Sequence, residues 1–123
     1  MISNTRAAAF FFVFAGLFGA AGVALAALAA HGGGEAALAA SASAMCLAHA
    51  PALLGLAIGI KEIRTARLAG FLIIVGTLLF AGDLVMLRLA GIGLFPFAAP
   101  TGGWAMMFGW LAIAAGGLMR NKP

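Results

Sequence analysis

Residues 78–88 read LLFAGDLVMLR, and this stretch places one carboxylate, Asp83, inside an apolar run that resembles a membrane-spanning helix. A charged side chain at membrane depth costs about 2.5–3.5 kcal/mol on insertion scales, so such a residue normally faces a bundle interior or water. Asp83 is therefore the first candidate for a functional site. The stretch itself predicts a helix that crosses a membrane.

The composition places the whole chain among integral membrane proteins. Of its 123 residues, 65% are hydrophobic and 8% are charged, whereas soluble domains have about 25% charged residues. At about 20 residues per span, this length accommodates four spanning helices with short connections and leaves no room for a soluble catalytic domain. We therefore expect residues 1–123 to form one all-α domain, a four-transmembrane-helix bundle.

Four apolar runs define the expected spans, and polar or glycine-rich breaks separate them. The first break, HGGGE at residues 31–35, disfavours helix and allows a tight reversal. Glu35 then stands where a second helix begins, a position that favours a carboxylate. The third break, residues 91–103, mixes Gly, Pro and Phe and predicts a loop whose Phe95 and Phe97 reach the membrane interface. The expected spans are residues 7–30, 36–60, 68–90 and 102–119.

The cations predict the orientation in the membrane. Lys61, Arg64 and Arg67 cluster between the second and third runs. If this loop and both termini face the cytoplasm, six of the seven Lys and Arg residues lie inside, and only Arg88 is near the other face. The cations lie beside apolar runs without interleaved stacking aromatics, so the net charge of +4 does not indicate a nucleic-acid partner.

Four polar residues form a candidate intramembrane site: Asp83, His49, His31 and Arg88. From the helical rise, Asp83 lies roughly 10 Å below the outer end of its helix, and His49 lies near the midplane. Because steps of roughly 10 Å are too long for direct proton transfer, a proton or small-solute path would need water. The alternative is that Asp83 is protonated or hydrogen-bonded to a neighbouring helix as a structural contact. Arg88 is expected to extend to the outer interface.

A weaker pattern suggests a metal. Met45, Cys46 and His49 share one helical face, and sulfur with imidazole suits Cu(I). Core packing is the default role for such residues, so we expect no cofactor. Cys46 is the only cysteine, which excludes an internal disulfide. Any further ligands would be sought among Met86, Met106 and Met107.

Glycine spacing predicts helix packing. Gly55 and Gly59 have the small-xxx-small spacing that lets two membrane helices approach closely. Gly102, Gly109 and Gly116 recur every seven residues, which forms a groove for a partner helix along the last run.

Several short motifs, taken in order and spacing, resemble domain-of-unknown-function family 423, whose small four-span membrane proteins include a mitochondrial transmembrane branch. The resemblance implies a four-helix bundle in a bacterial inner membrane and no settled activity. His31 and His49 fall on the family pattern, whereas Asp83 stands where the family usually has a small hydroxyl residue and Val85 where it has Tyr. The matching segments are Ala30-His31-Gly32, His49-Ala50, Ala52-Leu53-Leu54, Phe80, Gly82-x-Leu84, Pro100-x-Gly102-Gly103 and Gly109-Trp110.

Enzyme motifs are missing from the sequence. It contains no paired carboxylates and no metal motif with two His at fixed spacing, and the glycine run at residues 32–34 lacks the strand and lysine of a phosphate loop. We expect a non-enzymatic scaffold or accessory subunit in the bilayer that packs through glycine faces against itself or a larger membrane complex. The alternative function is a proton or small-solute channel or carrier that uses Asp83 and His49.

Overall fold

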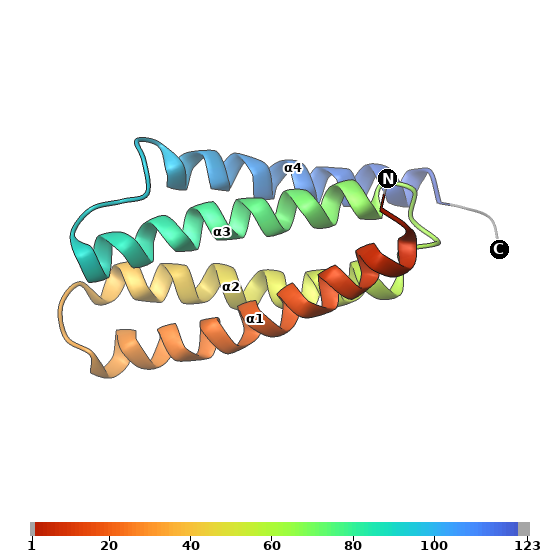
Figure 1. The fold of residues 1–123 in the computed structure, drawn as a ribbon. Helices are drawn as coiled ribbons and strands as arrows, with labels where there is room; N and C mark the ends of the chain where they lie inside the picture. The colour runs from red at the N-terminus through yellow and green to blue at the C-terminus, as the bar shows by residue number, and fades with distance from the viewer. Residues whose placement is uncertain (1, 121–123) are drawn as a thin grey trace.

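The computed structural model describes residues 2–120, which form four α-helices joined by three short connections (Figure 1). The predicted all-α class is confirmed. Among the described residues, α1, α2 and α3 are each long and apolar enough to cross a membrane. The helices are α1 (Asn4–His31), α2 (Ala36–Ile58), α3 (Ala66–Ala90) and α4 (Ala98–Leu118).

The fourth helix carries no charged side chain, and glycines, two tryptophans and one proline interrupt its aliphatic residues. It is not among the helices that meet the length and composition of a membrane span. The expected fourth span at residues 102–119 is therefore present as a helix, and its crossing of a membrane stays a prediction.

The helix boundaries agree with the expected spans except at the start of α4. We expected residues 91–103 to be a loop, but α4 begins at Ala98. Pro100 lies in the first turn, where its missing N–H has no intrahelical acceptor, so the proline does not prevent the helix from starting. Phe97 precedes the helix in a left-handed conformation, with φ of 67°.

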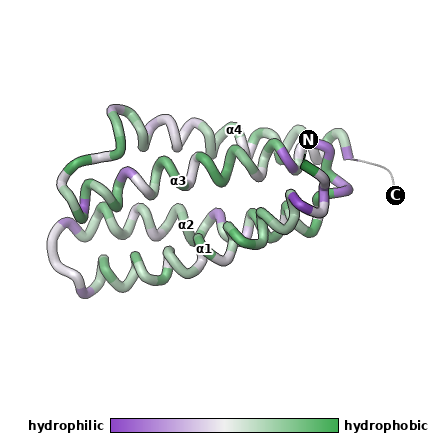
Figure 2. Tube along the Cα trace, in the orientation of Figure 1, coloured by the Kyte–Doolittle hydropathy of each residue, from purple (hydrophilic) through white to green (hydrophobic). Residues whose placement is uncertain are grey.

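Successive helices lie side by side and run in opposite directions, with α1 and α4 as the two outer helices (Figure 1). The N-terminus, the α2–α3 connection and the end of α4 share one end of the molecule, which we call the terminal end. The α1–α2 and α3–α4 connections form the opposite end. Figure 2 shows hydrophilic residues mainly at these two ends and hydrophobic residues along the helices between them.

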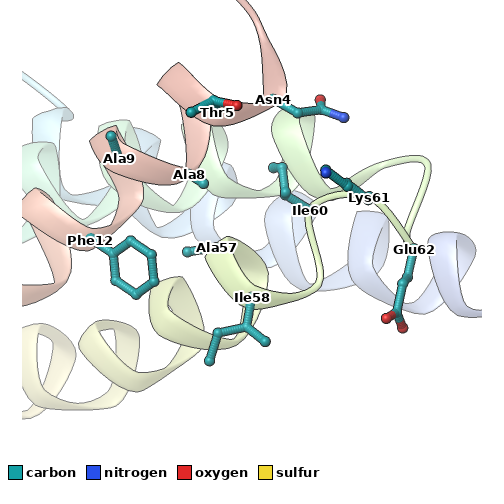
Figure 3. A pocket seen from close by; sticks show the side chains of 10 residues that line it. All are labelled: Asn4, Thr5, Ala8, Ala9, Phe12, Ala57, Ile58, Ile60, Lys61 and Glu62. Atoms are coloured by element: carbon teal, nitrogen blue, oxygen red, sulfur yellow. The ribbon is translucent and has the colours of Figure 1, made fainter.

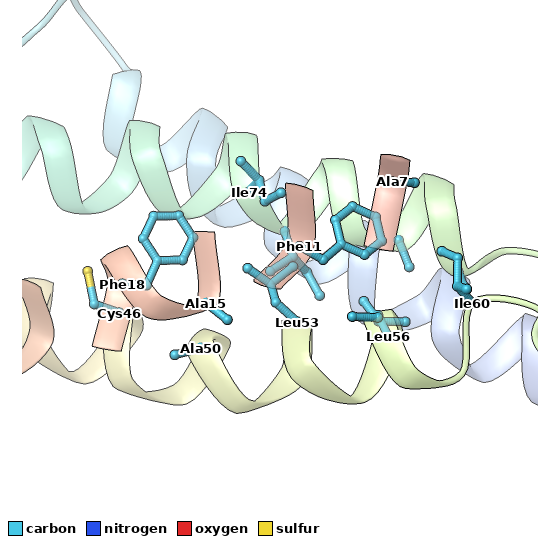
Figure 4. Close-up of a cluster of buried hydrophobic side chains, with 14 of the residues drawn as sticks. Ala7, Phe11, Ala15, Phe18, Cys46, Ala50, Leu53, Leu56, Ile60 and Ile74 are labelled. Carbon is cyan, nitrogen blue, oxygen red and sulfur yellow. The ribbon is translucent and has the colours of Figure 1, made fainter. Parts of the chain in front are cut away.

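The core lies between α1, α2 and α3. Phe11 of α1 is fully buried and packs on Gly70 of α3. Its phenyl ring occupies the space that a side-chain carbon at Gly70 would take. Leu53 of α2 and Ile73 of α3 are also fully buried. Figure 4 shows Phe11 of α1 near Leu53 of α2, and Phe18 of α1 near Cys46 of α2, in this cluster. The absence of a side chain at Gly70 thus allows an aromatic ring to fill the space between two helices.

Glycines also set the contact between α3 and α4. A side-chain carbon at Gly102 would lie 2.6 Å from the carbonyl oxygen of Gly76, and one at Gly109 would lie 2.8 Å from Ile73 Cγ1. Gly116 lies against Ile63 and Thr65 in the same way. The groove expected on the last helix is therefore filled by α3 and the α2–α3 connection of the same chain.

The expected packing face on α2 is not a contact within the chain. A side-chain carbon at Gly55 would have no atom within 4 Å. Gly59 is the C-cap of α2, and its nearest neighbours are the Gly55 carbonyl oxygen and Ile63. Among the described residues, no other helix covers Gly55, which lies exposed on the outer face of α2. The expectation that Gly55 and Gly59 pack against another helix therefore stays a prediction.

Gly102 and Gly103 offer a matched pair for testing the α3–α4 contact. Gly102→Ala is expected to lower the free energy of unfolding by about 1–3 kcal/mol, because the added methyl group meets the α3 backbone. Gly103→Ala adds the same group where no atom lies within 4 Å, so stability should stay equal or rise slightly. Thermal unfolding in detergent measures both, and equal effects would contradict the assigned contact.

Candidate functional site

Asp83 binds the connection that follows its own helix. Its side chain is 8% exposed, and Oδ1 accepts a hydrogen bond of 2.8 Å from the Leu94 N–H. Gly93 lies directly against the same oxygen, since a side-chain carbon there would overlap it. A carboxylate that accepts a backbone N–H forms a strong, charge-assisted bond. Asp83 is therefore a structural contact, as one of the two sequence hypotheses proposed, but its partner is a loop and not a neighbouring helix.

Arg88 holds the other connection at the same end of the molecule. Its Nη2 donates to the carbonyl oxygens of Gly32 and Gly33, the first at 3.2 Å. Gly34 packs against the guanidinium, and both Gly33 and Gly34 have φ of 67°. The glycine-rich turn presents two carbonyl acceptors to the guanidinium, and the expectation that Arg88 extends to the outer interface stays a prediction. Asp83 and Arg88 thus attach both connections at this end to α3.

His49 links α2 to α4. The side chain is 4% exposed, Nδ1 lies 2.7 Å from the Met45 carbonyl oxygen, and Nε2 accepts a bond of 3.1 Å from the Trp110 Nε1–H. Because an indole N–H only donates, Nε2 must be the acceptor and Nδ1 must carry the proton that is donated to Met45. The two partners therefore select the neutral imidazole with hydrogen on Nδ1.

Two hydroxyl groups make comparable links elsewhere. Ser43 Oγ of α2 donates to the Gly22 carbonyl oxygen of α1 at 2.6 Å. Thr65 Oγ1 donates to the Ala112 carbonyl oxygen of α4 at 2.5 Å. Each bond joins two segments through a helix carbonyl, a pattern typical of packed membrane helices.

The four residues predicted as one polar site have separate roles. His31 is exposed at the end of α1, and Arg88 reaches the residues that follow it. Within residues 2–120, no hydrogen bond joins His49 to Asp83, and each has its own partner. The two residues are thus not joined directly, and the water-mediated path that the sequence suggested stays a prediction.

The metal hypothesis finds little support in the geometry. Both ring nitrogens of His49 already have hydrogen-bond partners, so a copper ion could bind the ring only by displacing one of these partners. Cys46 is buried in the core cluster. Among the described residues, no group of three or more His, Cys, Asp or Glu side chains could hold a metal ion. Met106 is buried, whereas Met86 and Met107 are exposed.

Sequence reasoning did not identify the partners of these side chains. Trp110 was named only as part of a family motif, and Leu94 was not singled out at all. One signal was available for Trp110: an indole N–H on an apolar helix needs an acceptor, and His49 is one of few side-chain acceptors in the chain. No comparable signal exists for Leu94, because its donor is a backbone group.

A protein family of unknown function, DUF423, matches residues 25–103, which is well over half of the chain. The matched range runs from the end of α1 to the first turns of α4 and includes Asp83, His49 and Arg88. The resemblance drawn from the sequence is thereby confirmed, although Trp110 lies outside the matched range. No curated protein and no solved structure matches the chain.

Substitutions of Asp83 separate its role as an acceptor from its charge. Asp83→Leu should lower the free energy of unfolding by about 1–3 kcal/mol, because the Leu94 N–H loses its acceptor. Asp83→Asn keeps a carbonyl oxygen at the same place and should cost clearly less. Thermal unfolding in detergent and hydrogen exchange at the Leu94 amide measure the effects. Equal losses in both variants would show that the charge, and not the loop contact, stabilises this end.

The His49–Trp110 bond can be tested with the two tryptophans of α4. Trp110→Phe keeps an aromatic ring but removes the N–H donor, so stability should fall by about 0.5–1.5 kcal/mol. Trp104→Phe is the matched control, because Trp104 is largely exposed and stacks on Phe108. A double-mutant cycle with His49→Phe measures the coupling. A coupling energy near zero would contradict the link between α2 and α4.

Proposed function

Because this chain belongs to the DUF423 family of proteins of unknown function, we propose its role from its own geometry: a small multi-pass membrane protein that serves as a non-enzymatic scaffold or accessory subunit. The observation that carries the proposal is that the buried Asp83, His49 and Ser43 side chains bond other parts of the chain, while its outer faces are apolar. Such a chain is suited to binding other molecules on its surface, and its polar side chains serve as structural contacts.

The exposed surface supports a place in the bilayer. Large apolar side chains are exposed along both outer helices, a pattern that a soluble protein rarely shows over such an extent. In a membrane these side chains face lipid, and the backbone groups are satisfied within helices. At about 1.5 Å per residue, the 21 residues of α4 are also long enough for a fourth crossing. Examples are Phe10, Val13 and Leu17 on α1, and Trp104, Phe108 and Leu111 on α4.

The charges support an orientation with both termini in the cytoplasm of a bacterial cell. Arg6, Lys61, Arg64, Arg67 and Arg120 all belong to segments at the terminal end of the molecule. Lys122, which the sequence also assigns to this side, lies outside the described residues. Arg88 belongs to the opposite end and is used in a loop contact. This asymmetry agrees with the positive-inside rule for an inner-membrane protein.

The geometry favours the scaffold over the channel or carrier. Asp83 Oδ1 is held by the Leu94 N–H, and a path through His49 would require the Trp110 hydrogen bond to break in each cycle, because both ring nitrogens already have partners. Breaking such bonds would weaken the α2–α4 contact. Each buried donor or acceptor left without a partner would also lower the stability of the fold. The two residues thus serve better as fixed contacts than as moving carriers of protons or solutes.

The outer faces also suggest where a partner helix would lie. Gly16 of α1, Gly55 of α2 and Gly103 of α4 have no neighbouring atom within 4 Å of an added side-chain carbon. They leave small hollows between exposed apolar side chains, and close helix contact in membranes uses such positions. The proposed partners are a second copy of the chain or a larger membrane complex.

Two measurements on the same preparation test the function. After mild solubilisation of native membranes, the tagged chain should purify with a second copy or with a larger membrane protein. In proteoliposomes, proton and small-solute flux should equal that of empty vesicles, because no connected polar path is assembled. Flux above this background that disappears in Asp83→Asn, with the fold intact, would overturn the scaffold proposal. A strictly monomeric chain without partners would also oppose it.

A further inference from the structure

A groove of about 540 Å³ lies between the first turns of α1 and the C-terminal end of α2, at the terminal end of the molecule (Figure 3). The end of the groove nearest the α2–α3 connection, which we call its mouth, carries the polar Asn4, Thr5 and Lys61 beside the apolar Ile60. Figure 3 shows these side chains near the end of the helices, with Phe12 and Ile58 farther along the groove. None of these residues belongs to the contacts described for Asp83, Arg88 and His49.

The deeper part of the groove is apolar. Ala9 has a short side chain that leaves the groove open, whereas Phe12 and Ile58 form larger walls. From Asn4 to Phe12 the helix rises about 12 Å, because each residue adds about 1.5 Å. The groove thus changes from polar to apolar along the direction that leads from the terminal end toward the middle of the helices. This is the order in which a phospholipid presents its headgroup and its acyl chain.

The charge at the mouth favours an anion. Lys61 brings an ammonium group, which has three donors and also has other contacts in the chain. The one carboxylate that lines the groove, Glu62, forms an ion pair of 2.9 Å with Arg120, so a separate cation offsets its charge. Arg6 and Arg64 belong to the same end of the molecule. The mouth is therefore set in a positive surrounding that complements a phosphate.

We propose that this groove binds one anionic phospholipid of the cytoplasmic leaflet. The phosphate lies at Lys61, with Asn4 and Thr5 as further polar contacts, and one acyl chain follows Ala9 and Phe12. The proposal rests on the membrane location proposed above. A second copy of the chain fits the groove less well. If both copies have the same orientation in the membrane, their cationic terminal ends lie at the same membrane depth, and like charges repel.

Native mass spectrometry of the full chain, extracted from vesicles of equal parts phosphatidylglycerol and phosphatidylcholine, tests the proposal. The wild type should retain one phosphatidylglycerol per chain. Lys61→Gln should reduce this retention about fivefold, the effect of one lysine near an anionic lipid. Arg6→Gln removes the same charge from the same end but does not line the groove, so its retention should change less than about twofold. Equal losses in the two variants would overturn the groove as a site.

A steric variant provides an independent measurement. Ala9→Phe fills the groove from an exposed position and should abolish retention, whereas Ala20→Phe places the same ring on an exposed part of α1 outside the groove. Retention that is unchanged in Ala9→Phe, equal retention of both lipids, or a dimer without lipid would each overturn the proposal. Alkaline extraction of the membranes tests the location separately, because release of the wild-type chain would reject the membrane premise itself.

Discussion

A polar group inside an apolar surrounding must find its partner within the protein, because no water is available to replace it. This constraint accounts for the polar tertiary contacts of the chain. Asp83 accepts from the Leu94 backbone, His49 is held between Met45 and Trp110, and Ser43 donates to the Gly22 carbonyl oxygen. Apart from the His49–Met45 bond, which lies within α2, each of these bonds connects segments that the hydrophobic effect alone would leave free to slide.

The third helix takes part in close contacts with several other segments. Phe11 of α1 packs on its Gly70, and Gly102 of α4 packs on its Gly76. At one end Asp83 and Arg88 attach the two connections to it. Among the described residues, α3 lies close to all three other helices, and α2 also reaches α4 through the His49–Trp110 bond. Small residues on its two sides admit neighbours closely, and its Asp83 and Arg88 side chains hold the loops, so α3 acts as the central support of the fold.

The same arrangement bears on function. Side chains that first suggested a proton path are used to join helices and loops, which leaves the outer faces and the terminal end as the surfaces for other molecules. Apolar side chains and open glycines on the outer faces suit lipid or a partner helix. The terminal end combines cations with a groove that becomes apolar with depth. A scaffold that holds an anionic lipid at this end would use both kinds of surface at once.

The sequence by itself determined the number of helices, their approximate limits, the apolar exterior and the family. These properties depend on runs of similar residues and on local breaks such as the glycines at residues 32–34, so they can be recognised without knowledge of neighbours in space. The start of α4 was misplaced because Pro100 signals a break in general but is tolerated in a first helical turn. Only the tertiary structure decided what Asp83, Arg88 and His49 bind. Their partners lie 11, 56 and 61 residues away in the chain, and such pairings depend on how helices are placed side by side, which no local pattern records.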